Sequence, residues 1–122
     1  MKYLYLAIGG LSGTFSRYWL SRFIHETSGR GFPFGTLSVN VLGCLAAGLF
    51  ATMGQGSGQS TEMRLLLTVG FCGAFTTFSA LMLESGELFR SGLALQAVSN
   101  IVLSLFAGSL ALLAGSWIGS KI

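Results

Sequence analysis

Long apolar stretches dominate the chain and divide it into four segments. Three of them carry no charged residue: Gly31–Thr61, Leu65–Leu83 and Ser91–Ser120. A fourth begins at Tyr3 and runs to Phe23, with Arg17 as its first charge. About 20 predominantly apolar residues suffice to cross a bilayer. The pattern therefore predicts four transmembrane helices, at about residues 3–24, 34–53, 64–89 and 92–118.

The composition is that of a membrane protein without a separate soluble domain. The 122 residues are 52% hydrophobic and 9% charged, and the mean hydropathy is +0.71. Soluble domains carry about a quarter charged residues. The short connections at residues 25–33, at 54–62 and near Arg90 favour an up-down helix bundle. We therefore expect residues 1–122 to form one all-α, multi-pass domain in the cell membrane.

The ionisable side chains argue against an enzyme, and no nucleic-acid partner and no ATP or redox cofactor is expected. Cys44 and Cys72 both fall within predicted spans, where a free cysteine behaves as a small apolar residue. No nucleophile–base pair is evident, because the sequence contains only one histidine and four acids: His25, Glu26, Glu62, Glu84 and Glu87.

The basic residues do not favour one orientation of the chain in the membrane. Each side of the predicted bundle carries three: Lys2, Arg64 and Lys121 against Arg22, Arg30 and Arg90. Orientation normally follows an excess of Lys and Arg in short loops. Either one strong helix sets the topology, or the chain inserts both ways and pairs as an antiparallel dimer. Four such helices have too little bulk to enclose a wet pore alone, so we expect an oligomer.

Small residues spaced four apart predict close contacts between the helices. In lipid, such pairs let backbones approach one another. The pairs are Gly9 with Gly13, Gly43 with Ala47, and Gly115 with Gly119.

The segment from Gly70 to Ser79 contains helix-weakening glycines beside hydroxyls and aromatic rings, inside an apolar span. Glycine in a helix interior costs roughly 1 kcal/mol relative to alanine, and threonine hydroxyls compete for backbone carbonyls. No water is present in a bilayer to satisfy freed backbone groups. We therefore interpret this segment as an interrupted helix that forms an ion site.

Further polar side chains within the spans are candidates for the same site. Thr36, Asn40 and Gly43 follow i, i+4, i+7 and share one helix face. Asn40 is either interhelical glue or a pore amide. Arg17, toward the end of the first span, either snorkels to the interface or attracts anions into a vestibule.

Phe75 and Phe78 are expected on one face of the third span, with Met82 extending it. Such a stripe ordinarily packs, but the positive edge of an aromatic ring also suits a small anion. The hydroxyls of Thr77 and Ser79 would add hydrogen-bond donors.

Taken together, these motifs resemble the Fluc family of fluoride channels, also called CrcB. The similar segments are Gly10-Leu11-Ser12-Gly13 with Arg17-Tyr18, then Gly35-Thr36-Leu37 with Asn40 and Gly43, then Gly70-Phe71-Cys72-Gly73, and Thr76-Thr77-Phe78-Ser79 before Glu84. The resemblance covers nearly the whole chain, and the motif in the third span is very specific.

The resemblance implies a dual-topology antiparallel dimer with two narrow fluoride pathways and a third helix broken at the bilayer midplane. Backbone carbonyls matching Gly73 and Thr76, from both subunits, would hold one central structural Na⁺. Asn40 matches the pore amide of the family, and Phe78 matches the first of its two pore phenylalanines.

This chain departs from the family pattern at two positions. Leu81 stands where a second phenylalanine is usual, and Gly108 stands where a polar-track serine is usual, with Ser109 one place away. A shift of one residue turns a helical side chain by about 100 degrees. The chain therefore forms either a homodimer with an altered pathway or one half of a heterodimer whose paralogous partner supplies the missing ring.

We expect passive export of cytoplasmic fluoride, in which Arg17 attracts the ion, Asn40 donates an N–H, Phe78 offers its ring edge, and Thr77 and Ser79 replace lost hydration. Phe75 is an extra ring whose contribution stays open. The alternatives are a small four-helix multidrug exporter and a pore-impaired subunit of a heterodimeric channel. A proton-coupled exporter needs an embedded carboxylate, for which only Glu84 is available.

Overall fold

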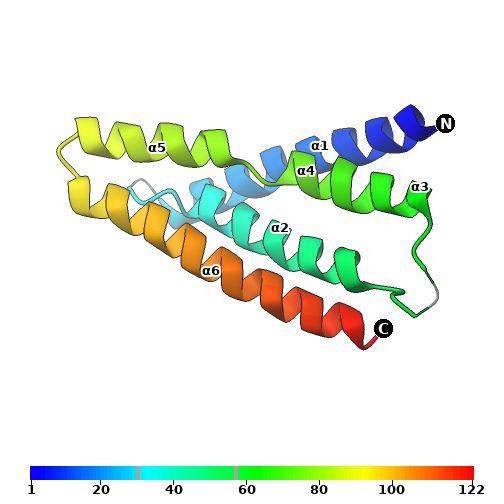
Figure 1. Ribbon diagram of the computed structural model, residues 1–122. Coiled ribbons are helices and arrows are strands. Elements are labelled where there is room, and N and C mark those ends of the chain that lie inside the picture. The colour runs from blue at the N-terminus through cyan, green and yellow to red at the C-terminus, as the bar shows by residue number, and fades with distance from the viewer. Residues whose placement is uncertain (30, 57) are drawn as a thin grey trace.

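The computed structural model describes residues 1–29, 31–56 and 58–122, which form a bundle of four antiparallel rods. Arg30, one of the basic residues counted above, lies outside these ranges. The first, second and fourth rods are single helices: α1 (Lys2–Ser28), α2 (Phe34–Thr52) and α6 (Ala94–Ser120). In Figure 1 both chain termini lie at one end of the bundle and the turn between the third and fourth rods lies at the other. The predicted up-down order is therefore confirmed.

The third rod is composite. It begins with α3 (Thr61–Arg64), continues as the π-helical segment η1 (Leu65–Cys72) and α4 (Gly73–Phe75), and resumes as α5 (Phe78–Arg90). A π-helix of this length is rare, because π turns are usually single bulges and are frequent at functional sites. Figure 1 shows the chain leaving the helical path between α4 and α5.

Within the described ranges, three segments are long and apolar enough to cross a membrane: Phe34–Thr52, Thr61–Arg90 and Ala94–Ser120. α1 has 27 residues, which is also long enough for a span, but it is less apolar than these three segments. It extends to Ser28, beyond the predicted end near residue 24. The helix stops only where Gly29 adopts a φ of 80°, a conformation that favours glycine.

The glycine pairs lie where helices touch backbone to backbone. A Cβ atom on Gly9 or Gly13 would overlap a carbonyl oxygen of η1, and one on Gly115 would overlap the carbonyl oxygen of Leu45 in α2. These contacts join α1 to η1 and α2 to α6. The predicted role of the small residues is therefore confirmed for these two pairs.

The two halves of the third rod pack against different neighbours. A Cβ on Gly13 of α1 would meet Phe71 in η1 and Ala74 in α4, so α1 lies close against this half. On α5, Ser85 is buried and accepts a hydrogen bond from Asn100 of α6. The interruption thus separates a half that rests on α1 from a half that rests on α6.

Candidate ion site at the interrupted third helix

The interruption consists of two threonines with extended backbone. Thr76 has φ −82° and ψ 154°, and Thr77 has φ −147° and ψ 112°. The Thr77 hydroxyl oxygen accepts a hydrogen bond of 3.2 Å from the Ala80 amide and so caps the N-terminus of α5. Threonine is a preferred capping residue because its oxygen replaces the carbonyl that the missing turn would supply. The sequence Thr-Thr therefore ends one helix and starts another.

Asn40 of α2 binds the backbone of Thr77 through both ends of its side-chain amide. Its Oδ1 accepts a hydrogen bond of 2.7 Å from the Thr77 amide, and its Nδ2 donates one of 3.0 Å to the Thr77 carbonyl oxygen. An asparagine amide has two N–H donors, so one remains after this pairing. Asn40 therefore joins α2 to the third rod at the interruption, and its second side-chain N–H remains available as a donor.

The same hydrogen bonds leave two backbone carbonyls without their helical partners. In a continuous α-helix, the Thr77 amide would bond to the Gly73 carbonyl and the Ala80 amide would bond to the Thr76 carbonyl. Both amides are instead taken by side-chain oxygens, those of Asn40 and Thr77. In the described ranges neither the Gly73 nor the Thr76 carbonyl oxygen accepts a hydrogen bond.

Arg17 of α1 reaches the same interruption from the other side. Its Nε donates a hydrogen bond of 3.0 Å to the carbonyl oxygen of Ala74, one residue before α4 ends. A positive charge is favourable at a helix C-terminus, where carbonyl dipoles are exposed. The side chain therefore binds the end of a half-helix, a contact that neither predicted role included. The two predicted roles of Arg17 stay predictions.

The predicted polar face of α2 is confirmed, because all three of its residues meet the third rod. Thr36 donates a hydrogen bond of 2.6 Å from its hydroxyl to Glu84 Oε1 in α5. Asn40 follows one turn later at Thr77, and a Cβ on Gly43 would overlap the Thr76 methyl group. The absent side chain at Gly43 is what allows the extended threonines to lie against α2.

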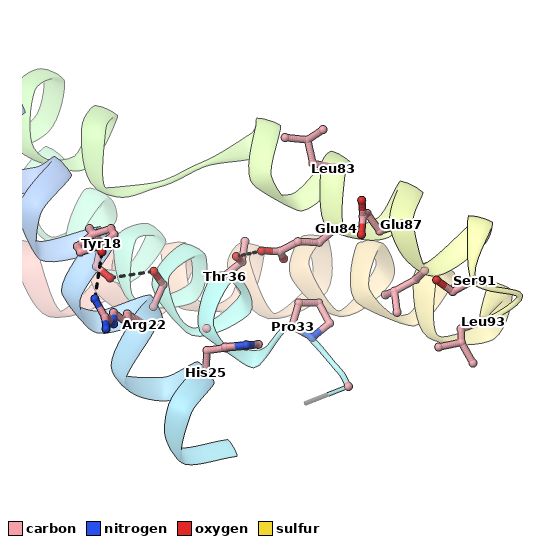
Figure 2. Close-up of a pocket in the computed structure, with 14 residues that line it drawn as sticks. Tyr18, Arg22, His25, Pro33, Thr36, Leu83, Glu84, Glu87, Ser91 and Leu93 are labelled. Atoms are coloured by element: carbon pink, nitrogen blue, oxygen red, sulfur yellow. Dashed lines mark hydrogen bonds between the residues drawn. The ribbon is translucent and has the colours of Figure 1, made fainter. Parts of the chain in front are cut away.

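A cavity of about 790 Å³ opens between α1, α2 and α5, at the end of the bundle away from the chain termini. Figure 2 shows the Thr36–Glu84 hydrogen bond on its inner side and His25 on its α1 side. Because Thr36 lines the cavity and Asn40 lies one helical turn beyond it, this face of α2 leads from the cavity to the interruption.

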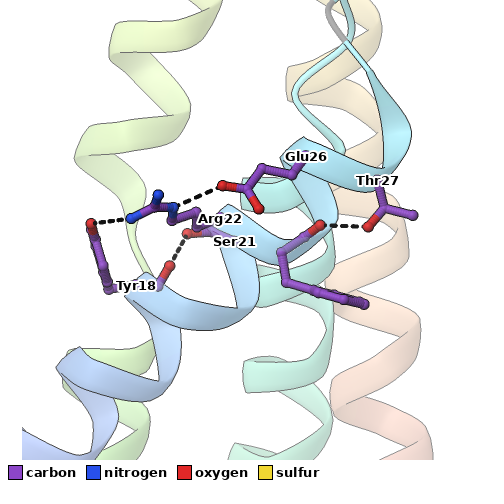
Figure 3. A network of polar contacts seen from close by, with 6 residues as sticks. Tyr18, Ser21, Arg22, Glu26 and Thr27 are labelled. Carbon is purple, nitrogen blue, oxygen red and sulfur yellow. Dashed lines mark hydrogen bonds and ion pairs between the residues drawn. The ribbon is translucent and has the colours of Figure 1, made fainter.

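The cavity wall carries charges of both signs, from Arg22 of α1 and from Glu84 and Glu87 of α5. Figure 3 shows Arg22 of α1 between two neighbours on its own helix: its Nε donates to Glu26 at 2.8 Å, and its Nη1 donates to the Tyr18 hydroxyl at 3.2 Å. This exposed pair contributes little to stability, because surface ion pairs are typically worth less than about 1 kcal/mol. Its effect is to hold the guanidinium beside the cavity.

The two predicted aromatic residues occupy different environments. Phe75 is buried and stacks on Phe71, with ring centroids 5.4 Å apart, whereas Phe78 is 71% exposed. The expectation that Phe75 and Phe78 share one face is wrong, because the extended threonines between them change the direction of the chain. Phe75 therefore packs within the subunit, and Phe78 presents its ring outward beside the exposed Ser79.

The positions that depart from the family pattern lie inside the subunit. Leu81 is 4% exposed. Gly108 is buried in α6, and a Cβ there would lie 3.4 Å from the Cys44 sulfur. Ser109 is exposed and donates to the carbonyl oxygen of Leu105 in its own helix, so it does not replace a serine at position 108.

One buried amide was absent from the predicted site residues. Asn100 has no exposed surface and donates to Ser85 at 3.0 Å. An amide within a charge-free span is the same signal that pointed to Asn40, but Asn100 has no glycine–threonine motif around it to suggest a site.

Comparison with known proteins agrees with this architecture. The family described as CrcB-like protein, Camphor Resistance (CrcB), matches residues 4–116. The chain is 43% identical over 122 residues to the fluoride-specific ion channel FluC of Desulforapulum autotrophicum, covering 99% of this chain and 98% of that one. It is 41% identical over 119 residues to the FluC protein of Solidesulfovibrio magneticus, covering 97% and 95% of the two chains. With a family match over nearly its full length and relatives at this identity, the chain belongs to the CrcB family.

Proposed function

We propose that this chain forms a fluoride-specific channel that exports cytoplasmic fluoride passively and so reduces its toxicity. Two relatives that align with nearly the whole chain are named fluoride-specific ion channels. Fluoride enters an acidified cell as neutral HF, dissociates in the cytoplasm and leaves as the anion down its electrochemical gradient. Membership in a family of ion channels agrees with the expectation that the chain is not an enzyme and favours a channel over a multidrug exporter.

The observation that carries the proposal is the interruption at Thr76 and Thr77, held open by Asn40. Three elements of 4, 8 and 3 residues precede it in the third rod, and one of 13 residues follows. The interruption therefore divides the 30-residue apolar segment almost equally. In a membrane this places it near the midplane, where unpaired backbone persists only beside protein, ions or water.

The fluoride pathway that we propose follows α2 from the cavity to the interruption. Thr36 stands at the cavity, and the second amide hydrogen of Asn40 is available one turn further on. The Thr77 and Ser79 hydroxyls lie 3.4 Å apart, and either can donate to the other, so one of their two hydrogens remains for donation to the anion. These groups replace the hydration that the anion loses on entering the membrane.

The exposed ring of Phe78 completes this set. A phenyl group that is 71% exposed at mid-membrane faces either lipid or a second subunit. Its edge carries positive quadrupole character, which attracts an anion without the desolvation cost of a full charge. Phe75 is buried on Phe71 and is not placed on this pathway.

The subunits are proposed to pair antiparallel around the interruption. A two-fold axis in the membrane plane brings the same surface of both copies together. If the interruption lies at the midplane, the interruption of one subunit then lies beside that of the other. Gly73 is exposed, and a Cβ on it would have no neighbour within 4 Å, so the backbone there is open to a partner. The equal numbers of basic residues predicted for the two sides suit insertion in both orientations.

The unpaired carbonyls of Gly73 and Thr76 suit the central Na⁺ that the resemblance implies. Two backbone oxygens per copy, freed from helical hydrogen bonds, form a donor set of hard, neutral ligands, as discontinuous helices provide for Na⁺ in transporters. Bound there, the ion would supply positive charge at the centre of the dimer. Arg17 on Ala74 adds a second positive charge at the same level.

Fluoride efflux from proteoliposomes, followed with a fluoride electrode, tests the proposal. The chain purified alone should release fluoride far faster than chloride and should not transport a cationic drug. Efflux of fluoride only after addition of a paralogous chain would assign it to a heterodimer. Drug transport coupled to protons, without fluoride efflux, would refute the channel.

A further inference from the structure

His25 lies in the wall of the cavity and takes no part in the contacts that hold the interruption. It comes from the polar end of α1, and its side chain is exposed on the α1 side of the cavity (Figure 2). The ion pair at this end of α1 joins Arg22 to Glu26, and among the described residues the His25 imidazole has no ion-pair or hydrogen-bond partner. His25 also lies outside the segments that resemble the Fluc family. Its side chain is therefore free to act on the contents of the cavity.

Acidic side chains dominate the wall that faces His25. The other described ionisable groups at the cavity or beside it come from α1 and α5: Tyr18, Arg22, Glu26, Glu84 and Glu87. Arg22 is held by Glu26 and by the Tyr18 hydroxyl, so its positive charge is largely compensated. The described lining residues from α2 carry no ionisable side chain, α6 contributes no described lining residue, and Arg30 lies outside the described ranges. An anion in the cavity therefore faces two glutamates of α5, and His25 is the described group that can oppose them.

Protonation of His25 changes the charge of the cavity. Histidine is the side chain whose ordinary charge change falls between pH 5 and 8. An anion at the centre of a cavity of about 790 Å³ lies about 6 Å from its wall, so one positive charge there raises the local anion concentration about two- to threefold. Because the polar face of α2 leads from this cavity to the interruption, a higher concentration of anions here increases their rate of entry into the pathway.

We propose that His25 attracts fluoride into the cavity, so that fluoride conduction rises as the pH falls through the range in which histidine becomes protonated. This inference rests on the proposed function as a fluoride channel and adds to it a residue that determines access of the anion. In an antiparallel dimer, one His25 faces each side of the membrane. Conduction is then greatest under acidic conditions, when fluoride enters the cell as HF and the need for export is greatest.

Fluoride currents through the channel in planar bilayers test the proposal, measured at pH 8 and at pH 5.5 with a fluoride concentration below saturation. Neutral HF carries no current, so the recording reports the anion alone. The current of the unmodified chain should rise about two- to threefold at the lower pH. His25→Gln should give the lower current at both pH values, because its side chain stays neutral. His25→Lys should give the higher current at both, because its side chain stays positive.

A matched control separates the cavity from the membrane surface as a whole. Thr27 is exposed two residues further along α1 and is not among the residues that line the cavity. Thr27→Lys adds the same charge at this end of the helix and should keep the pH dependence of the unmodified chain. A pH-independent current in the unmodified chain would overturn the proposal, as would an unchanged pH dependence in His25→Gln, which would assign the titration to Glu84 or Glu87. Absence of fluoride current at any pH would refute the channel itself, and this inference with it.

Discussion

Replacing Asn40 by serine should convert the interrupted helix toward a continuous one. Asn40 makes two hydrogen bonds to the Thr77 backbone, of 2.7 and 3.0 Å. The serine side chain is too short to make both. The freed Thr77 amide then has the Gly73 carbonyl, four residues earlier, as its natural acceptor. Closure of that bond would remove one of the two unpaired carbonyls and redirect α5.

The size of this effect follows from the two bonds that are lost. At a net value of about 1 kcal/mol for each hydrogen bond, the interrupted form loses about 2 kcal/mol, which is roughly a 30-fold shift in the equilibrium between the two forms. We expect fluoride efflux from Asn40→Ser proteoliposomes to fall at least tenfold, at about 1.4 kcal/mol per factor of ten. Ser109→Ala, whose hydroxyl bonds only to its own helix, should transport normally and serves as the control.

The result that refutes this reasoning is a folded Asn40→Ser protein with unchanged fluoride efflux. Folding is checked by size-exclusion chromatography and by thermal unfolding in detergent. A variant with normal unfolding and normal efflux would show that the Asn40–Thr77 pairing does not maintain the interruption and that Asn40 donates nothing essential to the anion.

Three further perturbations test other parts of the structure. Gly115→Ala should lower the stability of the fold by about 1–3 kcal/mol, because its Cβ would overlap the Leu45 carbonyl, whereas Gly10→Ala meets nothing within 4 Å and should be neutral in the same thermal unfolding assay. Arg17→Met should reduce fluoride efflux by leaving the Ala74 carbonyl at the end of α4 unpaired; equal efflux in the two proteins would contradict this role. Replacing Na⁺ by N-methylglucamine should lower the thermal stability of the dimer, by about 2.7 kcal/mol if Na⁺ was present at 100 times its Kd, and an unchanged melting temperature would argue against a structural Na⁺.

The number, order and approximate bounds of the helical rods follow from the distribution of apolar residues along the chain. A bilayer requires about 20 apolar residues per span, so hydropathy alone places them to within a few residues. The end of α1 is the exception, since residues 25–28 are polar but still helical until Gly29 stops the helix. The polar residues end the apolar stretch, but the helix itself ends only at the positive φ of Gly29.

The candidate site could be predicted only in part. Thr36, Asn40 and Gly43 were placed correctly on one face, because they lie in an uninterrupted helix with fixed periodicity. Phe75 and Phe78 do not share a face, because the extended Thr76 and Thr77 between them break the helical periodicity. Leu81 and Gly108 are interior positions of the subunit, which no pattern of neighbouring residues reveals.

The amino-acid sequence by itself thus determined a four-rod membrane bundle, its family and the segment that carries the interruption, because these depend on hydropathy and on local glycine and threonine chemistry. Only the tertiary structure decided how the interruption is held. Asn40 and Arg17 come from helices distant in the sequence, and their hydrogen bonds to Thr77 and Ala74 depend on how those helices pack. The same packing buries Asn100 against Ser85, a contact that becomes visible only when α5 and α6 lie side by side.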